Sequence, residues 1–328
     1  MFQPLSRRLL PRPLAVLLCT LACHATAFAA WPGDQPIRII VPQAAGGTND
    51  TVARIVAVEL GKALGQSVII DNKPGAAGAI GMQAVVQAKP DGYTLGLASD
   101  SAALLNVVRD NLTFNFPRDV AGVGMIGQQP ISVTVSARAP YKTLGELVAA
   151  GRKEPGGISY GSSGVGTNQH VIGEWLAKLS GARFTHIPYK GGGQATGDLV
   201  GGQVPMAVLG LAPMLAQEKA GKVRIVAVST PKRDPSVPDV PTLTELGYPQ
   251  IALAQWAGIV APTKMPPAVL EQLSRALQQV IAMPQVRHQL TEAGMQPESM
   301  PHAEFTTFIG KSARMWAELV PTLHLKLE

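Results

Sequence analysis

Cysteine is almost absent from this chain, and no arrangement of other metal-binding residues replaces it. Only two of the 328 residues are cysteine, Cys19 and Cys23, and both lie in the first thirty positions. The rest of the chain can therefore form no disulfide and no cysteine metal site. The six histidines show no metal-ligand spacing, and no HExxH motif occurs. The sequence predicts neither a metal nor a cofactor.

Charged residues are also scarce. They make up 15% of the chain against 46% hydrophobic residues, which is typical of a globular protein with a large core. Three of the +6 net charges are arginines in the first thirty residues, which contain no acid. No basic run is interleaved with aromatic residues, so nucleic-acid binding is not indicated. The mild positive charge that remains suits an acidic small ligand.

The first thirty residues predict an export signal. A basic segment, SRRLLPRP, precedes the apolar AVLLCTLAC, which is too short to span a bilayer as a helix. Ala27-Phe28-Ala29 fits the small-x-small cleavage rule, so we expect a signal peptide at 1–29 and a mature chain from Ala30. A lipid anchor at Cys23 is an alternative. Nothing after residue 30 resembles a membrane span, so we expect an exported soluble protein.

Short strand-like and helix-like segments alternate through most of the remaining chain. This alternation favours parallel sheets covered by helices, the α/β class. Residues 266–316 are mostly helical in pattern, and no internal repeat is visible. The predicted strands are 37–41, 67–72, 93–99, 131–136, 158–162, 184–189, 205–210 and 223–229, and the clearest predicted helices are 51–64, 143–153, 168–180 and 269–281.

Two extended stretches, 122–136 and 251–262, look like connections between domains. They would bracket an inserted middle domain, so that the chain leaves the first domain, builds the second and returns. We predict a first domain from 30–130 and 256–328 and a second from 131–255. That topology creates a cleft between lobes, a favoured place for a ligand.

The stretch PQAAGGTND, Pro42–Asp50, follows a predicted strand and precedes a predicted helix. Gly46 and Gly47 can bring backbone N–H groups close to a ligand, and Thr48 and Asn49 suit a helix N-cap. The lysine of a P-loop and the GxGxxG of a dinucleotide site are both missing. The stretch predicts an anion site at a helix N-terminus, with an ordinary turn as the alternative.

The stretch YGSSGVGTNQH, 160–170, repeats the arrangement with hydroxyl groups. Its serines, Thr167 and Asn168 surround three glycines before a helix, which makes a neutral cradle for a carboxylate. The alternative is a secreted hydrolase with Ser162 or Ser163 as nucleophile and His170 as base. A GxSxG elbow would need glycine where Val165 stands, which counts against it.

Two further turns, 72–81 and 97–106, also follow predicted strands, and Ser99, Asp100 and Ser101 could cap a helix there. The carboxyl ends of strands in open α/β sheets line one crevice, so the four turns are expected together. GVGMIG, 122–127, matches GxGxxG but leads into an extended segment instead of a helix. No acid–base pair can be named, so no enzyme is predicted.

Seven sequence blocks together resemble one family. The chain is similar to the solute-binding component of tripartite tricarboxylate transporters, periplasmic receptors also called Bordetella uptake gene proteins. The resemblance runs from Trp31 almost to the C-terminus. Its blocks are PIRIIVPQAAGGTND, GQSVIIDNKPGAAGAIG, KPDGYTLGLAS, YGSSGVGTNQHVIGE, IPYKGGGQATGDLVGGQVPM, AGKVRIVAVST and PDVPTLTELGYP.

The resemblance implies an α/β fold of the type II periplasmic binding protein kind. Two α/β lobes are joined by two crossover strands, with the ligand cleft between them. Hinge closure would trap a small organic carboxylate in the periplasm for delivery to the permease subunits of a membrane transporter. We expect a monomer without catalytic residues, and a ligand sensor or scavenger on the same scaffold is the alternative.

The resemblance also assigns the ligand site. In the family the first loop and the serine–glycine loop hold a ligand carboxylate through backbone amides, hydroxyls and waters. The residues expected to bind here are Gln43, Ala44, Ala45, Gly46, Gly47, Thr48, Asn49, Ser99, Ser101, Ser162, Ser163, Gly164, Val165, Thr167, Asn168, His170, Tyr189 and Leu209.

The chain departs from the family pattern at three places. Gln43 stands where an aromatic residue is usual, and Thr48 where a third glycine is common. Leu209 and Gly210 replace an acidic residue followed by asparagine. An acidic residue there could bind an ammonium group, so its loss disfavours an amino-acid ligand. We therefore expect a dicarboxylic or aromatic acid.

Overall fold

The structure is a computed structural model that describes residues 31–33 and 35–323. The predicted signal peptide, its cleavage site and both cysteines lie outside the described residues. The chain separates into two units, Met1–Gly33 and Asp34–Glu328. Every described helix and strand belongs to the second unit.

Two sheets organise the second unit, and one strand is common to both. The first sheet has the order β2-β1-β3-β9-β4, with β10 paired to the far side of β4. Pairs within β1, β2 and β3 are parallel, and those involving β9 or β10 are antiparallel. These strands are β1 (Ile37–Val41), β2 (Val68–Asn72), β3 (Thr94–Ser99), β4 (Val120–Ser136), β9 (Ala254–Pro262) and β10 (Gln296–Met300).

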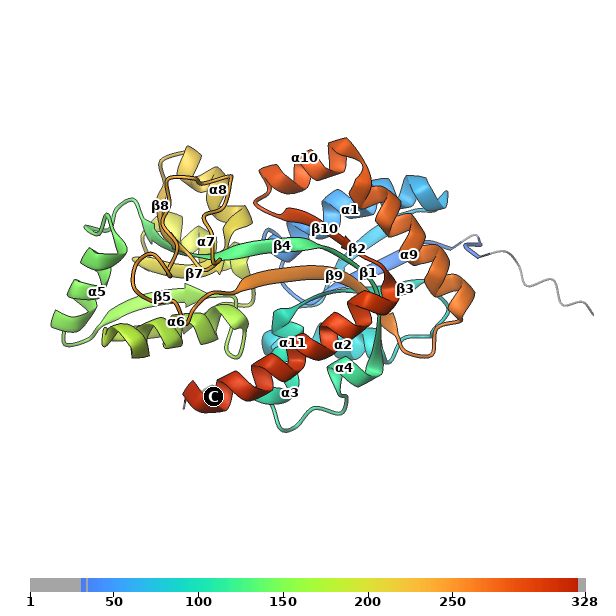
Figure 1. The fold of residues 1–328 in the computed structure, drawn as a ribbon, viewed down its shortest axis with the longest axis horizontal. Helices are drawn as coiled ribbons and strands as arrows, with labels where there is room; N and C mark the ends of the chain where they lie inside the picture. The colour runs from blue at the N-terminus through green and yellow to red at the C-terminus, as the bar shows by residue number, and fades with distance from the viewer. Residues whose placement is uncertain (1–30, 34, 324–328) are drawn as a thin grey trace, which may run out of the picture. The chain divides into compact units, whose positions relative to one another are not determined.

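Strand β4 changes partners part-way along its length. Val120–Pro130 pairs with β9 in the first sheet, whereas Ile131–Ser136 pairs with β7 and β8 in the second. Figure 1 shows β4 running from one sheet into the other. Proline suits the changeover, because it has no N–H to leave unpaired. The second sheet consists of this half of β4, β5 (Ile158–Ser162), β6 (Phe184–Pro188), β7 (Met206–Gly210) and β8 (Val223–Val228).

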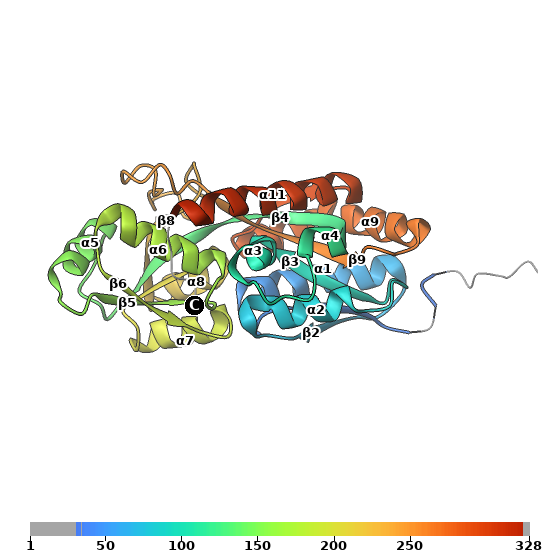
Figure 2. The same cartoon turned by 90° about the horizontal axis from the view of Figure 1, so that it is seen from below.

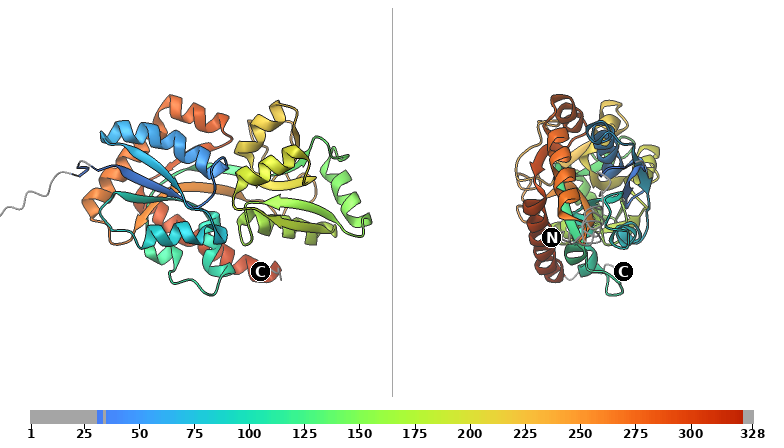
Figure 3. Two further views of the ribbon diagram at one scale, coloured as in Figure 1. Left: turned by 180° about the vertical axis from the view of Figure 1, so that it is seen from behind. Right: turned by 90° about the vertical axis from the view of Figure 1, so that its right-hand side faces the viewer.

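Helices cover both faces of each sheet (Figures 1, 2 and 3). A separate apolar core cluster lies on the α7–α8 side of the second sheet. On the first sheet, α1 (Thr48–Leu64), α9 (Pro267–Ala282) and α10 (Pro284–Glu292) contact one another opposite α2 (Ala79–Val86), α3 (Asp100–Val108), α4 (Phe116–Asp119) and α11 (His302–Leu323). On the second, α5 (Leu144–Lys153) and α6 (Asn168–Ser180) lie opposite α7 (Gly192–Gly201) and α8 (Leu211–Lys219). A 3-10 turn, Ala76–Gly78, precedes α2.

The fold is the mixed α/β arrangement of two lobes joined by crossover strands that the sequence predicts. The prediction of parallel sheets is wrong in part, because β4, β9 and β10 pair antiparallel. The chain leaves the first lobe along β4 and returns to it along β9. Because the two strands run in opposite directions, they pair antiparallel. Strand β10 was not foreseen within the helical pattern of 266–316. The domain limits at 130/131 and 255/256 stay a prediction.

The C-terminal helix α11 runs along β4 (Figure 2). It packs on β4 and β9 through an aromatic cluster. The Trp256 ring meets Phe305 edge-on, with centroids 5.6 Å apart, and its Nε1 donates to Ser312 Oγ at 3.0 Å. Phe305 is fully buried against Gly258 of β9. The far end of α11 reaches the other lobe, where Lys178 Nζ donates to Leu323 O at 2.8 Å.

Two absences hold for the described residues. None of their helices combines the length and apolar character needed to cross a membrane. They also bring together no group of three or more histidine, cysteine, aspartate or glutamate side chains able to hold a metal ion.

Gly258→Ala tests the packing of α11 on β9. An added Cβ would meet Phe305 Cε1 at 2.6 Å and Gly124 O at 2.8 Å, so the substitution should lower the free energy of unfolding by about 1–3 kcal/mol. The matched control is Gly197→Ala, where a Cβ meets nothing within 4 Å and helix propensity should raise stability by about 0.5–1 kcal/mol. Urea unfolding measures both, and equal effects would contradict the packing.

Candidate functional site

Five helices begin around one region between the two lobes. Asn49 Nδ2 at the start of α1 donates to Ser99 Oγ before α3 at 3.5 Å, and Ser101 Oγ donates to Asn168 Oδ1 of α6 at 2.8 Å. The starts of α7 and α8 approach the start of α1 at Gly47 and Thr48. Helix N-termini present N–H donors and the positive end of the helix dipole, so this region favours negative charge.

Polar side chains, all but one of them uncharged types, fill the region, and all are at least nine-tenths buried. Amides and hydroxyls can donate or accept as a ligand requires. Asp100 is the one acidic group among them. We call this set the interlobe cage: Thr48, Asn49, Ser99, Asp100, Ser101, Gln129, Ser163, Asn168, Gln169 and Gln255.

The first loop is held in shape by Asp50. Its carboxylate accepts hydrogen bonds from Gly46 N at 3.0 Å, Asn72 Nδ2 at 3.0 Å and Arg54 Nη2 at 2.9 Å. Asn72 also donates to Gln43 O at 3.0 Å. Burial alone would raise the pKa of Asp50, but these hydrogen bonds together lower it. Asp50 therefore stays ionised, and its negative charge is balanced by Arg54 and by the N–H groups that it accepts from.

The second loop is built from its own side chains. Ser162 Oγ accepts from Gly164 N at 3.1 Å, and Thr167 Oγ1 donates to Gly164 O at 2.8 Å. Thr167 also caps α6 by accepting from His170 N at 3.3 Å. His170 Nδ1 accepts from Gly166 N at 3.1 Å. His170 thus supports the loop that the sequence assigned to carboxylate binding.

The Ser–His170 pairing of the hydrolase alternative does not form. Ser162 Oγ lies 2.6 Å from the Nε2 atom of His186, a residue that sequence reasoning missed, and Ser163 Oγ donates to Gln169. The rings of His170 and His186 stack with centroids 3.8 Å apart. Burial lowers the pKa of His170 to about 4, and burial together with His170 lowers that of His186 to about 3. Both histidines are neutral at neutral pH.

A continuous chain of amides links the lobes through β9. Gln255 Nε2 donates to Asn49 Oδ1 at 3.4 Å, and Gln169 Nε2 donates to Gln255 Oε1 at 3.4 Å. Gln169 in turn accepts from Ser163 N at 3.2 Å. The first loop, the crossover strand and the second loop are therefore coupled.

Asp100 connects the lobes at a second point. Its Oδ2 accepts from Asn168 Nδ2 at 2.9 Å, while its Oδ1 is buried and has no partner among the described residues. Burial raises the pKa of Asp100 to about 7, against the hydrogen bond from Asn168, which lowers it. A carboxyl group that titrates near neutrality thus lies between the N-termini of α3 and α6.

The loops of the two lobes touch backbone to backbone. Ala44 N donates to Lys190 O at 3.3 Å, and an added Cβ on Gly191 would lie 2.8 Å from Ala44 N. An added Cβ on Gly193 would collide with Ala45 O. The segment 190–193, absent from the expected site residues, is therefore the surface on which the first loop rests. Only glycine permits this approach.

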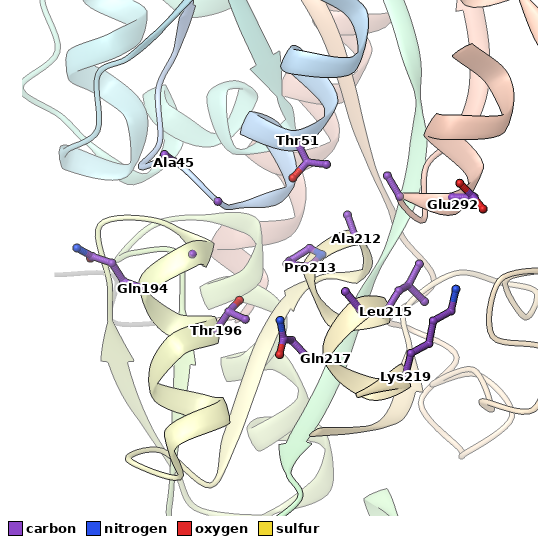
Figure 4. Close-up of a pocket in the computed structure, with 14 residues that line it drawn as sticks. Ala45, Thr51, Gln194, Thr196, Ala212, Pro213, Leu215, Gln217, Lys219 and Glu292 are labelled. Atoms are coloured by element: carbon purple, nitrogen blue, oxygen red, sulfur yellow. The ribbon is translucent and has the colours of Figure 1, made fainter. Parts of the chain in front are cut away.

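Two hollows flank the contact. One of about 240 Å³ is lined by Gln43, 163–165 and Tyr189, together with Arg109 and Lys190. The other, about 700 Å³, lies between the start of α1 and the helices α7 and α8. In Figure 4, Ala45 and Thr51 form one wall and Gln194, Thr196, Ala212 and Pro213 the opposite wall.

The two remaining expected residues lie beside the cage. Tyr189 Oη donates to Asp198 Oδ2 at 2.7 Å. Leu209 is fully buried in the apolar cluster of α7, α8 and β8, and its Cδ2 lies 3.7 Å from where a Cβ on Gly192 would be. Leu209 therefore places an apolar side chain next to the start of α7.

The main residues that sequence reasoning missed are polar groups in unexpected places. They are Gln129, Gln169, His186 and Gln255, with the turn 190–193. Gln129 and Gln255 could have been noticed, because each is a polar residue within an extended apolar stretch. His186 and Gln169 gave no such signal.

Comparison with known proteins finds a family of transporter receptors. Residues 52–325 match the family described as "Tripartite tricarboxylate transporter family receptor". BugT of Bordetella pertussis is 30% identical over 318 residues, which cover 96% of this chain and 97% of BugT.

Solved structures agree over nearly the whole chain. The periplasmic binding protein BugD is 30% identical with a TM-score of 0.86, covering 90% of this chain and 99% of its own. MatC from Rhodopseudomonas palustris with bound malate is 27% identical with a TM-score of 0.79, covering 87% and 98%. The R. palustris protein Rpa4515 with adipate is 27% identical with a TM-score of 0.85, covering 89% and 98%.

Gly193→Ala should push the lobes apart. The added Cβ would meet the backbone of Ala45 and Gly46, so we expect the form with the lobes in contact to lose about 1–3 kcal/mol of stability. The affinity for the ligand should fall roughly tenfold. The free energy of unfolding of each lobe should be unaffected. Small-angle scattering should give a larger radius of gyration than wild type when ligand is present, and Gly197→Ala on the same helix should not. Wild-type size and affinity in Gly193→Ala would refute the contact.

Asp100→Asn should change how stability depends on pH. The folded-state pKa of about 7 exceeds the ordinary 3.8, so between these values the folded chain keeps a proton that the unfolded chain releases. The contribution of Asp100 to stability therefore falls as pH rises through this window, by about 1.4 kcal/mol per unit.

Urea unfolding of wild type and Asp100→Asn from pH 4.5 to 8 measures this contribution. The histidines oppose it, because their lowered pKa values cost stability as pH falls. The difference between the two proteins removes their effect, since both retain His170 and His186. Parallel pH profiles would show that Asp100 is not buried as described.

Proposed function

The chain belongs to the tripartite tricarboxylate transporter receptor family, and we propose that it binds a small organic carboxylate in the interlobe cage for delivery to a membrane permease. Family membership makes it a periplasmic solute-binding receptor and not an enzyme.

The convergence of five helix N-termini carries this proposal. The first and second loops place backbone N–H groups and the side chains of Asn49, Ser163 and Asn168 around one region. Such donors offset the loss of carboxylate hydration. No lysine or arginine belongs to the cage, and the two nearby histidines are neutral. The binding is therefore of moderate affinity and reversible, as a receptor that releases its ligand requires.

Hinge closure follows from the division of these groups between lobes. The first loop and Ser99 belong to one lobe and the second loop to the other, while Gln255 lies on a crossover strand between them. A ligand that contacts both loops favours the form in which the lobes touch, because only that form makes both sets of contacts. The glycines at 191–193 allow the approach.

The ligands of two relatives and the apolar Leu209 support one class of ligand. MatC binds malate and Rpa4515 is described with adipate, both dicarboxylates. Leu209 offers nothing to an ammonium group, which supports a dicarboxylic or aromatic acid over an amino acid. Arg109 and Lys190 beside the smaller hollow would attract an anion from solution.

Thermal unfolding of residues 30–328 with a panel of acids tests the proposal. The panel holds mono-, di- and tricarboxylates, aromatic acids, amino acids and simple esters. An acid at one hundred times its dissociation constant should add about 2.7 kcal/mol of stability, a shift of a few degrees. We expect the shift with one class of carboxylate and none with amino acids.

A matched pair of variants locates the effect. Asn168→Ala removes a fully buried cage amide and should abolish most of the shift, whereas Asn111→Ala in an exposed turn should leave it intact. Tight binding of an amino acid would overturn the ligand class. Consumption of an ester would revive the hydrolase alternative, and a shift unaffected by Asn168→Ala would place the ligand elsewhere.

A further inference from the structure

Two glutamines face each other on the crossover strands. Gln129 of β4 and Gln255 of β9 are direct partners in the antiparallel ladder, so their side chains project from the same face. They are 1% and 2% exposed. Both therefore lie at the floor of the interlobe cage, where the lobes are joined.

The side-chain amides of Gln129 and Gln255 differ in how many of their hydrogen-bonding groups have a partner. Gln255 donates to Asn49 and accepts from Gln169. Gln129 Oε1 accepts from Ala212 N at 3.4 Å, but its Nε2 is buried without a partner among the described residues. The backbone N–H of Ala212 can only donate, so it fixes Oε1 toward α8 and leaves Nε2 as the spare group. A buried donor without an acceptor is uncommon in folded proteins.

The surroundings of Gln129 place it at the α1–α8 side of the cage. An added Cβ on Gly210 would collide with Thr48 Oγ1 of α1 and lie 3.4 Å from Gln129 Oε1. Ala212 also lines the hollow of about 700 Å³ shown in Figure 4. Leu209, one residue before Gly210, packs in the apolar cluster of α7, α8 and β8. Ala45 and Gly46 of the first loop line the same hollow, so a ligand seated there would lie between the first loop and the start of α8.

We propose that Gln129 determines specificity by donating from Nε2 to an oxygen at the far end of the ligand. This inference rests on the proposed function and deepens it. A second carboxylate, a hydroxyl or a carbonyl can accept the hydrogen bond. A hydrocarbon end leaves the donor unpaired, and an ammonium group opposes one donor with another. Dicarboxylic and hydroxy acids are therefore preferred over plain aromatic acids and amino acids.

Calorimetric titration with matched acids tests this assignment. The pairs are butanedioate with butanoate and hexanedioate with hexanoate, which differ at one end only. Wild type should prefer the diacid. Gln129→Met keeps the length of the side chain but has no donor, so it should bind the preferred diacid roughly tenfold or more weakly, as for a lost hydrogen bond to a charged group. The monoacid should change less than about twofold.

The neighbouring residue is the matched control. Gln128 lies on the same strand, and its Nε2 donates to Glu298 Oε2 of β10 at 2.8 Å, outside the cage. Gln128→Met should leave both affinities unchanged. Urea unfolding of each variant checks that it is folded.

A second variant keeps the test decisive if Gln129→Met is unstable. Gln129→Glu retains an oxygen for Ala212 N and replaces the donor with an anionic acceptor. It should weaken the diacid further and improve binding of 6-aminohexanoate relative to hexanedioate. This change in preference between the two acids would not result from a general loosening of the cage.

Three results would contradict the inference and are distinguishable. If wild type binds diacids and both variants keep the wild-type preference, Gln129 does not set specificity, although the proposed function stands. If diacid and monoacid weaken equally, Gln129 acts only by supporting the cage. If wild type binds no acid, the proposed function itself fails, and this inference fails with it.

Discussion

Strand β4 is the constraint on which the site depends. Because its two halves pair with different sheets, the carboxyl ends of β1, β3, β5 and β7 are brought to one place, and the helices that follow begin there. The changeover at Pro130 and Ile131 lies directly beside Gln129. The strand that joins the lobes therefore also supplies a polar group to the space between them, so the connection between the lobes and the proposed ligand site share residues.

The positive potential in the cage comes from helix N-termini and not from cationic side chains within it. Asp50 and Arg54 neutralise each other while shaping the first loop, and burial keeps His170 and His186 uncharged. An anion within the cage would then be stabilised by dipoles and N–H groups, while Arg109 and Lys190 lie beside the smaller hollow. Asp100 is the exception, and its raised pKa means that it need not add a full negative charge beside a bound acid.

Much of the fold and the outline of the site could be predicted from sequence, because the signals are local. A strand, a glycine-rich turn and a helix start are predicted as one unit before α1 and again before α6. The expected side-chain cap forms only at α6, through Thr167, because the N-cap of α1 is Gly47 and not Thr48 or Asn49. Contacts between distant segments gave no such signal. The pairing of Ser162 with His186 instead of His170, and the seating of the first loop on 190–193, arise only when β5, β6 and the opposite lobe are packed together. Strand β10 was missed because its polar sequence forms only an edge pairing with β4.

The close approach of the loops also explains why a ligand would shift the hinge. With the lobes in contact, water is excluded from the cage and each hydrogen bond within it becomes stronger. The same exclusion penalises a buried group that lacks a partner, such as Gln129 Nε2. In an open cleft water would supply that partner. A molecule that brings its own acceptor oxygen into the closed cage removes the penalty, and so stabilises the closed form by more than its contacts with either lobe alone. Selectivity and closure then depend on the same unpaired donor.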